Sequence, residues 1–384
     1  MPTDPIYLDY SATAPLRREA REAMLPYMEG CFGNPSSLHR WGREARAALD
    51  DARDRLAAVI GAAPSEVVFT RGGTEADNMA VLGRAHCMPQ APVVCSAIEH
   101  KAVLATVKAA ARLTGAPFHV VPVDGDGVVR EEQVYALLEE KPSVVSVMWA
   151  NNEVGAVQPI ERLADRCKEA GVSFHTDAVQ AFGKLPVRVD EVPVSLLSVS
   201  AHKVGGPRGV GALFVRKGTR LHPLIYGGSQ ERGLRPGTED VAGAVGLAVA
   251  AELAVRDREA DMVRLGALRD RLEAGLRAAI PDLVVNAATA KRLATVLSVC
   301  IPGADAGALI PALDLEGIAA SGGSACSSGS SEPSYVLVAM GLDGQVAAPS
   351  ARFSLGKETT AEEIERVLAT VPAVVERLRS FASA

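Results

Sequence analysis

The sequence has few cysteines, and their spacing gives no reason to pair them. Six cysteines are scattered over 384 residues, and none belongs to a Cys-x-x-Cys pair. This distribution argues against a disulfide framework and against a zinc site. Free thiols are typical of a reducing compartment, so we expect a cytoplasmic protein without a structural metal.

Long apolar runs and clusters of basic residues are also missing. The N-terminal stretch MPTDPIYLDYSATAPL lacks the positive start and apolar core of a signal peptide. The most apolar long stretch, residues 241–255, is too short to span a bilayer and contains Glu252. The net charge of −6 is spread along the chain. We therefore expect neither a nucleic acid nor a membrane surface as a partner.

What the sequence does contain is a regular alternation of apolar strands and amphipathic helices. Hydrophobic residues make up 48% of the chain, which suffices for one large domain or two joined ones. Helices are predicted over 74–86, 101–113 and 131–140. Strands are predicted over 66–70, 92–96, 117–123, 143–149, 172–178, 195–200 and 211–215. This order predicts an α/β fold with a large, mostly parallel sheet covered by helices on both faces.

The last third of the chain has a different pattern. Residues 239–280 are helical, as one bent helix or two, and residues 281–384 predict a smaller α+β domain. We expect a large domain over 13–255 and a small domain from 1–12 and 256–384. The Ser/Gly-rich stretch 320–334 is either a linker-like loop or a functional one.

Polar residues follow several of the predicted strands, where ligands of parallel sheets bind. Gly73 and Thr74 follow the strand 66–70 and open a helix, a place that suits a phosphate group, although this stretch alone favours an ordinary N-cap after a turn. His100 and the pair Asn151-Asn152 follow two further strands. A lone histidine is more often structural, and Asn-Asn is usually a turn signal.

Asp177 and Lys203 carry the most specific chemistry. Asp177 ends the strand 172–178, where it either caps the next helix or faces a cationic ring nitrogen. Lys203 follows the strand 195–200, after Ser200 and His202. A lysine is usually a surface residue, but in a partly desolvated crevice it becomes a nucleophilic amine. A Schiff-base lysine, an acid for a pyridinium nitrogen and a phosphate cradle together predict a pyridoxal phosphate site.

The residues that carry this site belong to longer runs with a family pattern. Those runs resemble the cysteine desulfurases of the NifS/IscS type, in the class V aminotransferase group of fold-type I pyridoxal phosphate enzymes. They extend from residue 7 to residue 356, and together they are highly specific. They read YLDYSATAP, FGNPSSLHRWG, VFTRGGTEADN, EHKAV, NNEVGAVQPI, HTDAVQAFGKLP, SAHKVGGPRGVGAL, RPGTEDV, SGGSACSSGSSEPSYVL and RFSLG.

The resemblance implies a role for each matching residue. Lys203 binds the cofactor, Asp177 faces its ring nitrogen, and His100 lies over the ring and relays protons. Cys326, on the Ser/Gly-rich loop, is the nucleophile that receives sulfur. The remaining implied positions are Gly73, Thr74, Ser200 and His202 for the phosphate, Thr238 for the phosphate of a partner subunit, Gln180 and Asn152 for the ring hydroxyl or the substrate carboxylate, and Asn34 and Arg352 for the substrate carboxylate.

The same resemblance implies conversion of L-cysteine to L-alanine by a homodimer, with sulfur passed to an acceptor such as an iron–sulfur scaffold protein. The chain ends soon after RFSLG, without the longer tail by which IscS-type members dock the scaffold, so the acceptor stays open. A small-substrate aminotransferase, a selenocysteine lyase and a non-catalytic scaffold are the alternatives. Cys326 separates the first two from a desulfurase. Because glycines and serines surround it, we expect its loop, 322–332, to be mobile rather than part of a core.

Overall fold

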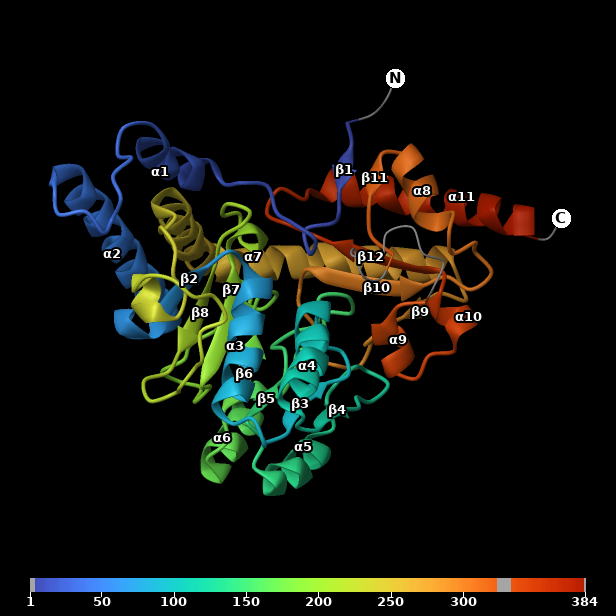
Figure 1. The fold of residues 1–384 in the computed structure, drawn as a ribbon. Coiled ribbons are helices and arrows are strands. Elements are labelled where there is room, and N and C mark those ends of the chain that lie inside the picture. The colour runs from blue at the N-terminus through green and yellow to red at the C-terminus, as the bar shows by residue number, and fades with distance from the viewer. Residues whose placement is uncertain (1–3, 323–332, 383–384) are drawn as a thin grey trace.

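A seven-stranded sheet forms the centre of the larger part of the molecule, with the strand order β2-β8-β7-β6-β5-β3-β4 (Figure 1). Only β8 runs antiparallel to its neighbours, so the predicted α/β fold with a mostly parallel sheet is confirmed. Each predicted strand is present, in most cases in a shorter form. The strands are β2 (Val67–Thr70), β3 (Val93–Ser96), β4 (Phe118–Val121), β5 (Val144–Ser146), β6 (Phe174–Asp177), β7 (Leu196–Ser200) and β8 (Gly211–Val215).

The structure, a computed structural model, describes residues 4–322 and 333–382. Cys326 and nearly all of the loop expected to be mobile lie outside these described residues. Within the described ranges, none of the helices has the length and apolar character needed to cross a membrane.

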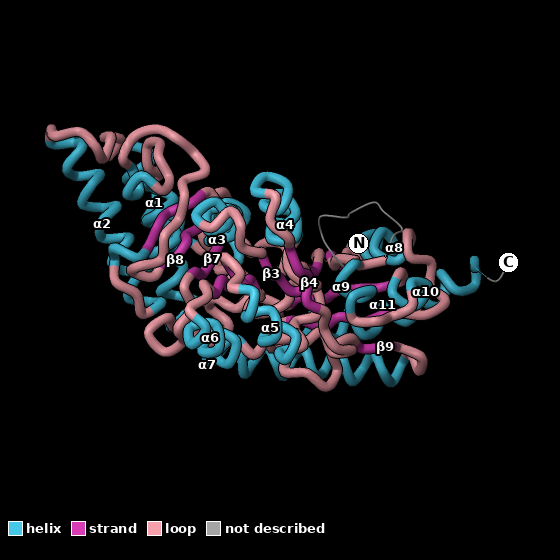
Figure 2. Tube along the Cα trace, turned by 60° about the horizontal axis from the view of Figure 1, so that its bottom comes forward, coloured by secondary structure: helices cyan, strands magenta, loops and turns pink. Residues whose placement is uncertain are grey.

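Helices cover both faces of the large sheet. Figure 2 shows α3 (Gly73–Cys87) and α4 (Lys101–Thr114) on one side of the strands and α7 (Val241–Ala279) on the other. Residues 131–140 form α5 (Glu131–Leu137) and a short 3-10 turn, and α6 (Ile160–Ala170) follows β5. Two N-terminal helices that were not predicted, α1 (Arg18–Glu29) and α2 (Arg40–Ile60), pack against α7. Helix α2 ends at Gly61, whose φ of +73° is a backbone conformation that glycine adopts readily.

The helix α7 joins the two parts of the molecule. It is one continuous helix, and its N-terminus is capped by Asp240, which accepts a hydrogen bond from Gly243 N at 2.9 Å. Its first half contributes Ala244 to Ala254 to the core under the large sheet, and its second half contributes Leu265, Leu272 and Leu276 to a separate apolar core. The domain boundary expected after residue 255 therefore falls inside this helix.

The second core belongs to a smaller α+β unit. Its antiparallel sheet has the order β12-β10-β9, from β12 (Ser350–Ser354), β10 (Val296–Cys300) and β9 (Val284–Val285). Near the N-terminus, β1 (Ile6–Tyr7) pairs in parallel with β11 (Ile318–Ala319). This pairing ties the start of the chain to the small unit and leads residues 9–13 toward the large sheet. The helices α8 (Leu309–Leu315) and α11 (Ala361–Ala382) pack into this second core, whereas the short helices α9 (Tyr335–Ala339) and α10 (Gly344–Ala347) bury their apolar residues in the first core.

Candidate active site

A cavity of about 270 Å³ lies where the parallel strands of the large sheet end. Its lining comes from the segments that follow β2, β3, β5, β6 and β7, together with one strand of the small unit. This is the edge at which the sequence predicted a ligand. Ten of the predicted site residues line it: Gly73, Thr74, His100, Asn152, Asp177, Gln180, Ser200, His202, Lys203 and Arg352.

The strand register brings the acid and the lysine together. β6 and β7 are parallel neighbours, and Asp177 lies opposite Ser198. Lys203 follows β7 in a short 3-10 turn, residues 201–203. Asp177, at the end of β6, and Lys203, after β7, therefore lie at the ends of neighbouring parallel strands.

One end of the cavity is built to accept an anion. The chain turns after β2 at Gly72, whose φ of +129° favours glycine, and α3 begins at Gly73 with free backbone N–H groups. A Cβ added at Gly73 would lie 2.9 Å from Val179 Cγ2, so a side chain there would crowd the cradle. His202 lies beside it, and burial lowers the pKa of its imidazole to about 4, so the ring is neutral at pH 7. Glycine backbone and a helix N-terminus suit a phosphate group.

Asp177 and His100 form the opposite, more buried part of the site. Asp177 Oδ1 accepts a hydrogen bond from Val179 N at 2.8 Å. Burial raises the pKa of Asp177, while His100 and Lys203 act in the opposite direction. His100 Nδ1 accepts from Ala102 N at 3.1 Å, so the neutral ring carries its proton on Nε2. Burial also lowers the pKa of His100. A buried carboxyl beside a neutral imidazole provides a good partner for a cationic ring nitrogen.

Lys203 is held by the N-terminal segment, which the sequence did not assign to the site. Its Nζ donates to the carbonyl oxygens of Ser11 and Ala12, at 2.5 and 2.7 Å. Gln180 Nε2 donates to the same Ser11 oxygen at 2.9 Å. The Ser11 carbonyl therefore positions both the Lys203 amine and the Gln180 amide.

Arg352 enters the cavity from β12 of the small unit. Its Nη1 donates to the carbonyl oxygen of Asn152 at 2.9 Å, and its Nη2 pairs with Asp9 Oδ1 at 2.6 Å. Only 1% of the residue is exposed. A buried guanidinium held on two sides is rigid, which suits recognition of a carboxylate.

Five further residues that the sequence did not assign also line the cavity: Ser11, Ala12, Asp77, Met148 and Val179. Asp77 is the only one with a visible signal, a carboxylate in the first turns of α3. Several lining groups are buried yet have no hydrogen-bond partner within the described part of the chain. They are Ser11 Oγ, Asp77 Oδ1, Asn152 Oδ1 and Arg352 Nε.

Unpaired buried groups are costly unless a ligand completes them. Their position around Lys203 and Asp177 fits pyridoxal phosphate with an amino acid substrate. Gly73, Thr74 and Ser200 would hold the phosphate, and Asp177 the ring nitrogen. The bound cofactor acts as an electron sink for carbanion chemistry at the substrate Cα.

Two predicted site residues, Asn34 and Thr238, lie outside this cavity within the single chain. Asn34 lies in the loop between α1 and α2, is exposed, and accepts a hydrogen bond from Ser36 N at 2.9 Å. Thr238 is also exposed, just before α7. Neither residue lines the 270 Å³ cavity.

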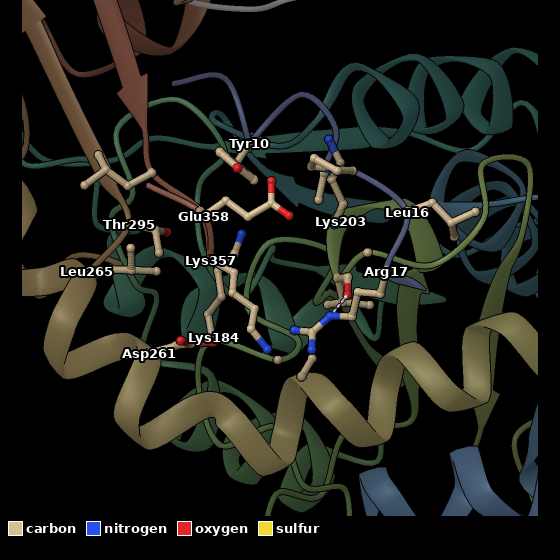
Figure 3. A pocket seen from close by; sticks show the side chains of 18 of the residues that line it. Tyr10, Leu16, Arg17, Lys184, Lys203, Asp261, Leu265, Thr295, Lys357 and Glu358 are labelled. Atoms are coloured by element: carbon tan, nitrogen blue, oxygen red, sulfur yellow. Dashed lines mark hydrogen bonds between the residues drawn. The ribbon is translucent and has the colours of Figure 1, made fainter. Parts of the chain in front are cut away.

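A second, larger cavity of about 500 Å³ shares Lys203 with the first. Figure 3 shows it between the long helix α7 and residues of the small unit, with Lys184, Lys203, Arg17 and Lys357 extending toward it. Arg17 and Lys357 both pair with Asp257, at 3.2 and 2.7 Å. The cation of Lys184 instead donates to Gln180 Oε1 at 3.0 Å.

Comparison with known proteins agrees with this site. Residues 6–367 match the family described as Aminotransferase class-V. The chain is 44% identical to a cysteine desulfurase IscS from Dictyoglomus turgidum over 98% of this chain and 96% of that one. It is 44% identical to the cysteine desulfurase NifS of Azotobacter vinelandii, over 98% and 94% of the two chains. A solved structure titled NifS-like protein superposes with a TM-score of 0.90 at 36% identity, covering 97% of this chain and 100% of that one. The predicted resemblance is confirmed, and the lyase and aminotransferase alternatives are not favoured: the chain belongs to the class V aminotransferase family, among its pyridoxal phosphate-dependent cysteine desulfurases.

Proposed function

We propose that the chain converts L-cysteine to L-alanine and receives the sulfur on Cys326 as a persulfide. The Cys326 thiolate attacks the substrate sulfur, so a sulfur–sulfur bond forms as the bond between sulfur and the substrate Cβ breaks. The electron pair of that bond stays with Cβ, which then gains a proton. Lys203 serves as the cofactor lysine and proton acceptor from Cα, and His100 as the proton relay.

The observation that carries this proposal is the position of the described residues on the two sides of Cys326. Ser321 precedes Cys326 in the chain and Tyr335 follows it, and both lie beside the cavity. Ser321 pairs with Arg352, since Arg352 N donates to Ser321 O at 2.6 Å and Ser321 N donates to Arg352 O at 3.2 Å. On the far side, Tyr335 Oη donates to the carbonyl oxygen of Glu99 at 2.7 Å, next to His100. Cys326 is four residues beyond Gly322, a reach of at most about 14 Å. Both anchors lie beside lining residues of the cavity, which supports Cys326 as the nucleophile.

The test is Cys326→Ser, assayed for alanine, sulfide and protein persulfide. We expect the variant to keep the cofactor spectrum and the spectral change on adding cysteine, while sulfide and alanine formation fall to background. Cys87→Ser is the matched control, because Cys87 is a free and exposed cysteine. Sulfide release by Cys326→Ser at the rate of the parent enzyme would refute the proposed sulfur transfer.

The functional unit in this proposal is a homodimer. Large apolar side chains are exposed around the α1–α2 loop, with Phe32 75%, Leu38 90% and Trp41 50% exposed, and Tyr226, in the segment that precedes Thr238, is 76% exposed. A second copy would cover these groups, because exposed apolar patches of this kind mark interaction sites. The same contact would carry Asn34 and Thr238 into the partner's cavity.

Mixed dimers test this arrangement. A dimer of one Lys203→Ala subunit and one Thr238→Ala subunit contains one site with an intact lysine and an intact threonine, provided that Thr238 acts across the interface. We expect such mixtures to recover activity that neither variant has alone. A monomer in sedimentation experiments at micromolar concentration, or no recovery in the mixtures, would contradict the dimer.

The acceptor of the persulfide sulfur in this proposal is a protein, such as an iron–sulfur scaffold or a component of another thio-cofactor pathway. The names IscS and NifS of the relatives support a sulfur-delivery role. The proposed compartment is the cytoplasm, where a reactive thiol remains reduced. Transfer of radioactive sulfur from loaded Cys326 to a purified scaffold protein tests the acceptor, and transfer that also occurs to a protein without cysteines would argue against it.

A further inference from the structure

Lys184 contacts the cofactor cavity only indirectly, through Gln180. It lines the larger, 500 Å³ cavity (Figure 3) and is not among the residues that line the 270 Å³ cavity. Its Nζ donates to Gln180 Oε1 at 3.0 Å, and Gln180 itself lines the cofactor cavity. The turn that returns Lys184 to Gln180 passes through Gly183, whose φ is +74°. Lys184 therefore contacts Gln180 from the side of the larger cavity, outside the 270 Å³ cavity.

This contact fixes which end of the Gln180 amide faces which neighbour. Lys184 Nζ donates to the amide oxygen, and in its charged form it can only donate, which holds that oxygen toward Lys184. The Ser11 carbonyl can only accept, and Gln180 Nε2 lies 2.9 Å from it. Rotating the amide by half a turn would place donor against donor and acceptor against acceptor. The amide nitrogen carries two hydrogens, and Ser11 uses one, which leaves the second for a ligand in the cavity.

We propose that Lys184 is a positioning residue of the cofactor site, which fixes the Gln180 amide so that its N–H donates to the bound cofactor or substrate. The proposal rests on the proposed function, because that function supplies the ligand. Lys184 touches neither the cofactor nor the substrate. Its effect passes through Gln180 and, by way of the Ser11 carbonyl, reaches the segment that also holds Lys203.

The cost of placing an amine here supports a specific role. Burial lowers the pKa of Lys184 to about 7, and the nearby positive charges of Lys203 and Arg352 act in the same direction. A methionine of similar length would fill the position without that electrostatic cost. Lysine instead supplies the hydrogen-bond donor that the amide oxygen of Gln180 requires.

The test is a double-mutant cycle on Lys184→Met and Gln180→Ala. In each variant the absorbance maximum of the bound cofactor and the dissociation constant of the cofactor are measured. Loss of one hydrogen bond costs about 0.5–1.5 kcal/mol, so we expect Lys184→Met to shift the absorbance maximum and weaken cofactor binding about 2- to 10-fold. Gln180→Ala should have at least as large an effect, and the double variant should match Gln180→Ala alone. Lys357→Met is the control, because it lines the same cavity but pairs with Asp257.

Two other variants keep the proposal testable if Lys184→Met does not fold. Lys184→Arg retains a donor-only cation and should preserve the absorbance maximum. The glutamine side chain in Lys184→Gln can accept as well as donate, so this variant should shift the absorbance maximum. An unchanged absorbance maximum in Lys184→Met, or effects that add in full in the double variant, would overturn the proposal. Such a result would leave sulfide release by the parent enzyme intact, so it is distinct from failure of the sulfur-transfer mechanism.

Discussion

The amine of Lys203 donates to the carbonyl oxygen of Ala12 at 2.7 Å. Ala12 belongs to the N-terminal segment, and Lys203 follows β7 in the large sheet, so this contact joins that segment to the large sheet within the 270 Å³ cavity. Carbonyl oxygens favour the charged ammonium form of the amine. The Lys203 nitrogen would have to leave these oxygens and lose a proton before it could react with the aldehyde of a bound cofactor.

This arrangement predicts that Lys203 alone carries the cofactor covalently. Lys203→Ala should lose the adduct that borohydride traps, since no other lysine of the described residues lines the 270 Å³ cavity. Peptide mapping of the reduced parent enzyme should find the adduct at Lys203. An adduct on Lys184, which lines the adjoining cavity, would show that the assignment is wrong.

Substitution of Asp177 should slow alanine formation far more than substitution of Asp77, which lines the same cavity. A carboxylate fixed against a cationic ring in a water-poor site is worth about 2.7–4 kcal/mol, so Asp177→Asn should slow alanine formation about 10²- to 10³-fold. Burial favours the uncharged form of Asp77 by raising its pKa, and its Oδ1 lies 3.6 Å from His175 Nε2, so Asp77→Asn should change the rate less. Equal, few-fold losses in the two variants would exclude the role given to Asp177. Thermal melting of both variants checks that the fold is intact.

The sequence predicted the strand-end residues because their position depends on local order. A strand that ends at Asp177 and another that ends three residues before Lys203 place both side chains at one sheet edge by the rules of parallel pairing. The N-terminal segment could not be placed in the same way. Ser11 and Ala12 reach the site because Ile6 pairs with Ile318, a contact between distant parts of the chain that leaves no local pattern.

Arg352 shows the same limit from the other end of the chain. Its assignment came from the family resemblance alone, and its partner Asp9 is 343 residues away. Helix α2 was missed for a different reason. Its apolar face is made largely of alanine, and arginines and acids fill the remainder of its sequence. Alanine favours helix but gives a weak apolar signal, so the packing against α7 is visible only in the structure.

Arg352 should control affinity for the substrate carboxylate more than the chemical step. A hydrogen bond to a charged group contributes about 1.5–3 kcal/mol, so Arg352→Gln should raise KM for L-cysteine about 10- to 150-fold and change kcat less. Arg352→Lys should restore little, because a lysine cannot hold both the Asn152 oxygen and Asp9 in the same geometry.

Cysteamine, which is cysteine without its carboxylate, provides the control for that experiment. Its binding, followed by the spectral change of the cofactor, should be similar in the parent enzyme and Arg352→Gln. If the variant weakens both ligands equally, Arg352 supports the cavity as a whole and does not recognise the carboxylate.

His175 should make the protein sensitive to acid. Its ring is fully buried, with Nδ1 2.8 Å from Ser146 Oγ and Nε2 3.0 Å from Ser198 Oγ. Burial lowers the pKa of His175 to about 3, whereas a histidine in the unfolded chain has a pKa of about 6.5. Between these values the unfolded state binds one more proton than the folded state. The free energy of unfolding therefore falls as the pH falls through this window, by about 1.4 kcal/mol per pH unit from this residue.

His175→Gln removes that proton while keeping a polar side chain between the two hydroxyls. Urea unfolding of the cofactor-free protein at pH 7, 6 and 5, at one protein concentration, should give a steeper loss of stability for the parent chain than for the variant. Other groups titrate in both proteins, so the difference between the two slopes isolates His175. The variant should be less stable at pH 7, where the neutral ring makes both hydrogen bonds, and the two curves should converge toward acid pH. Parallel curves would mean that His175 takes up its proton in the folded protein, and that the network of Ser146 and Ser198 does not hold it neutral.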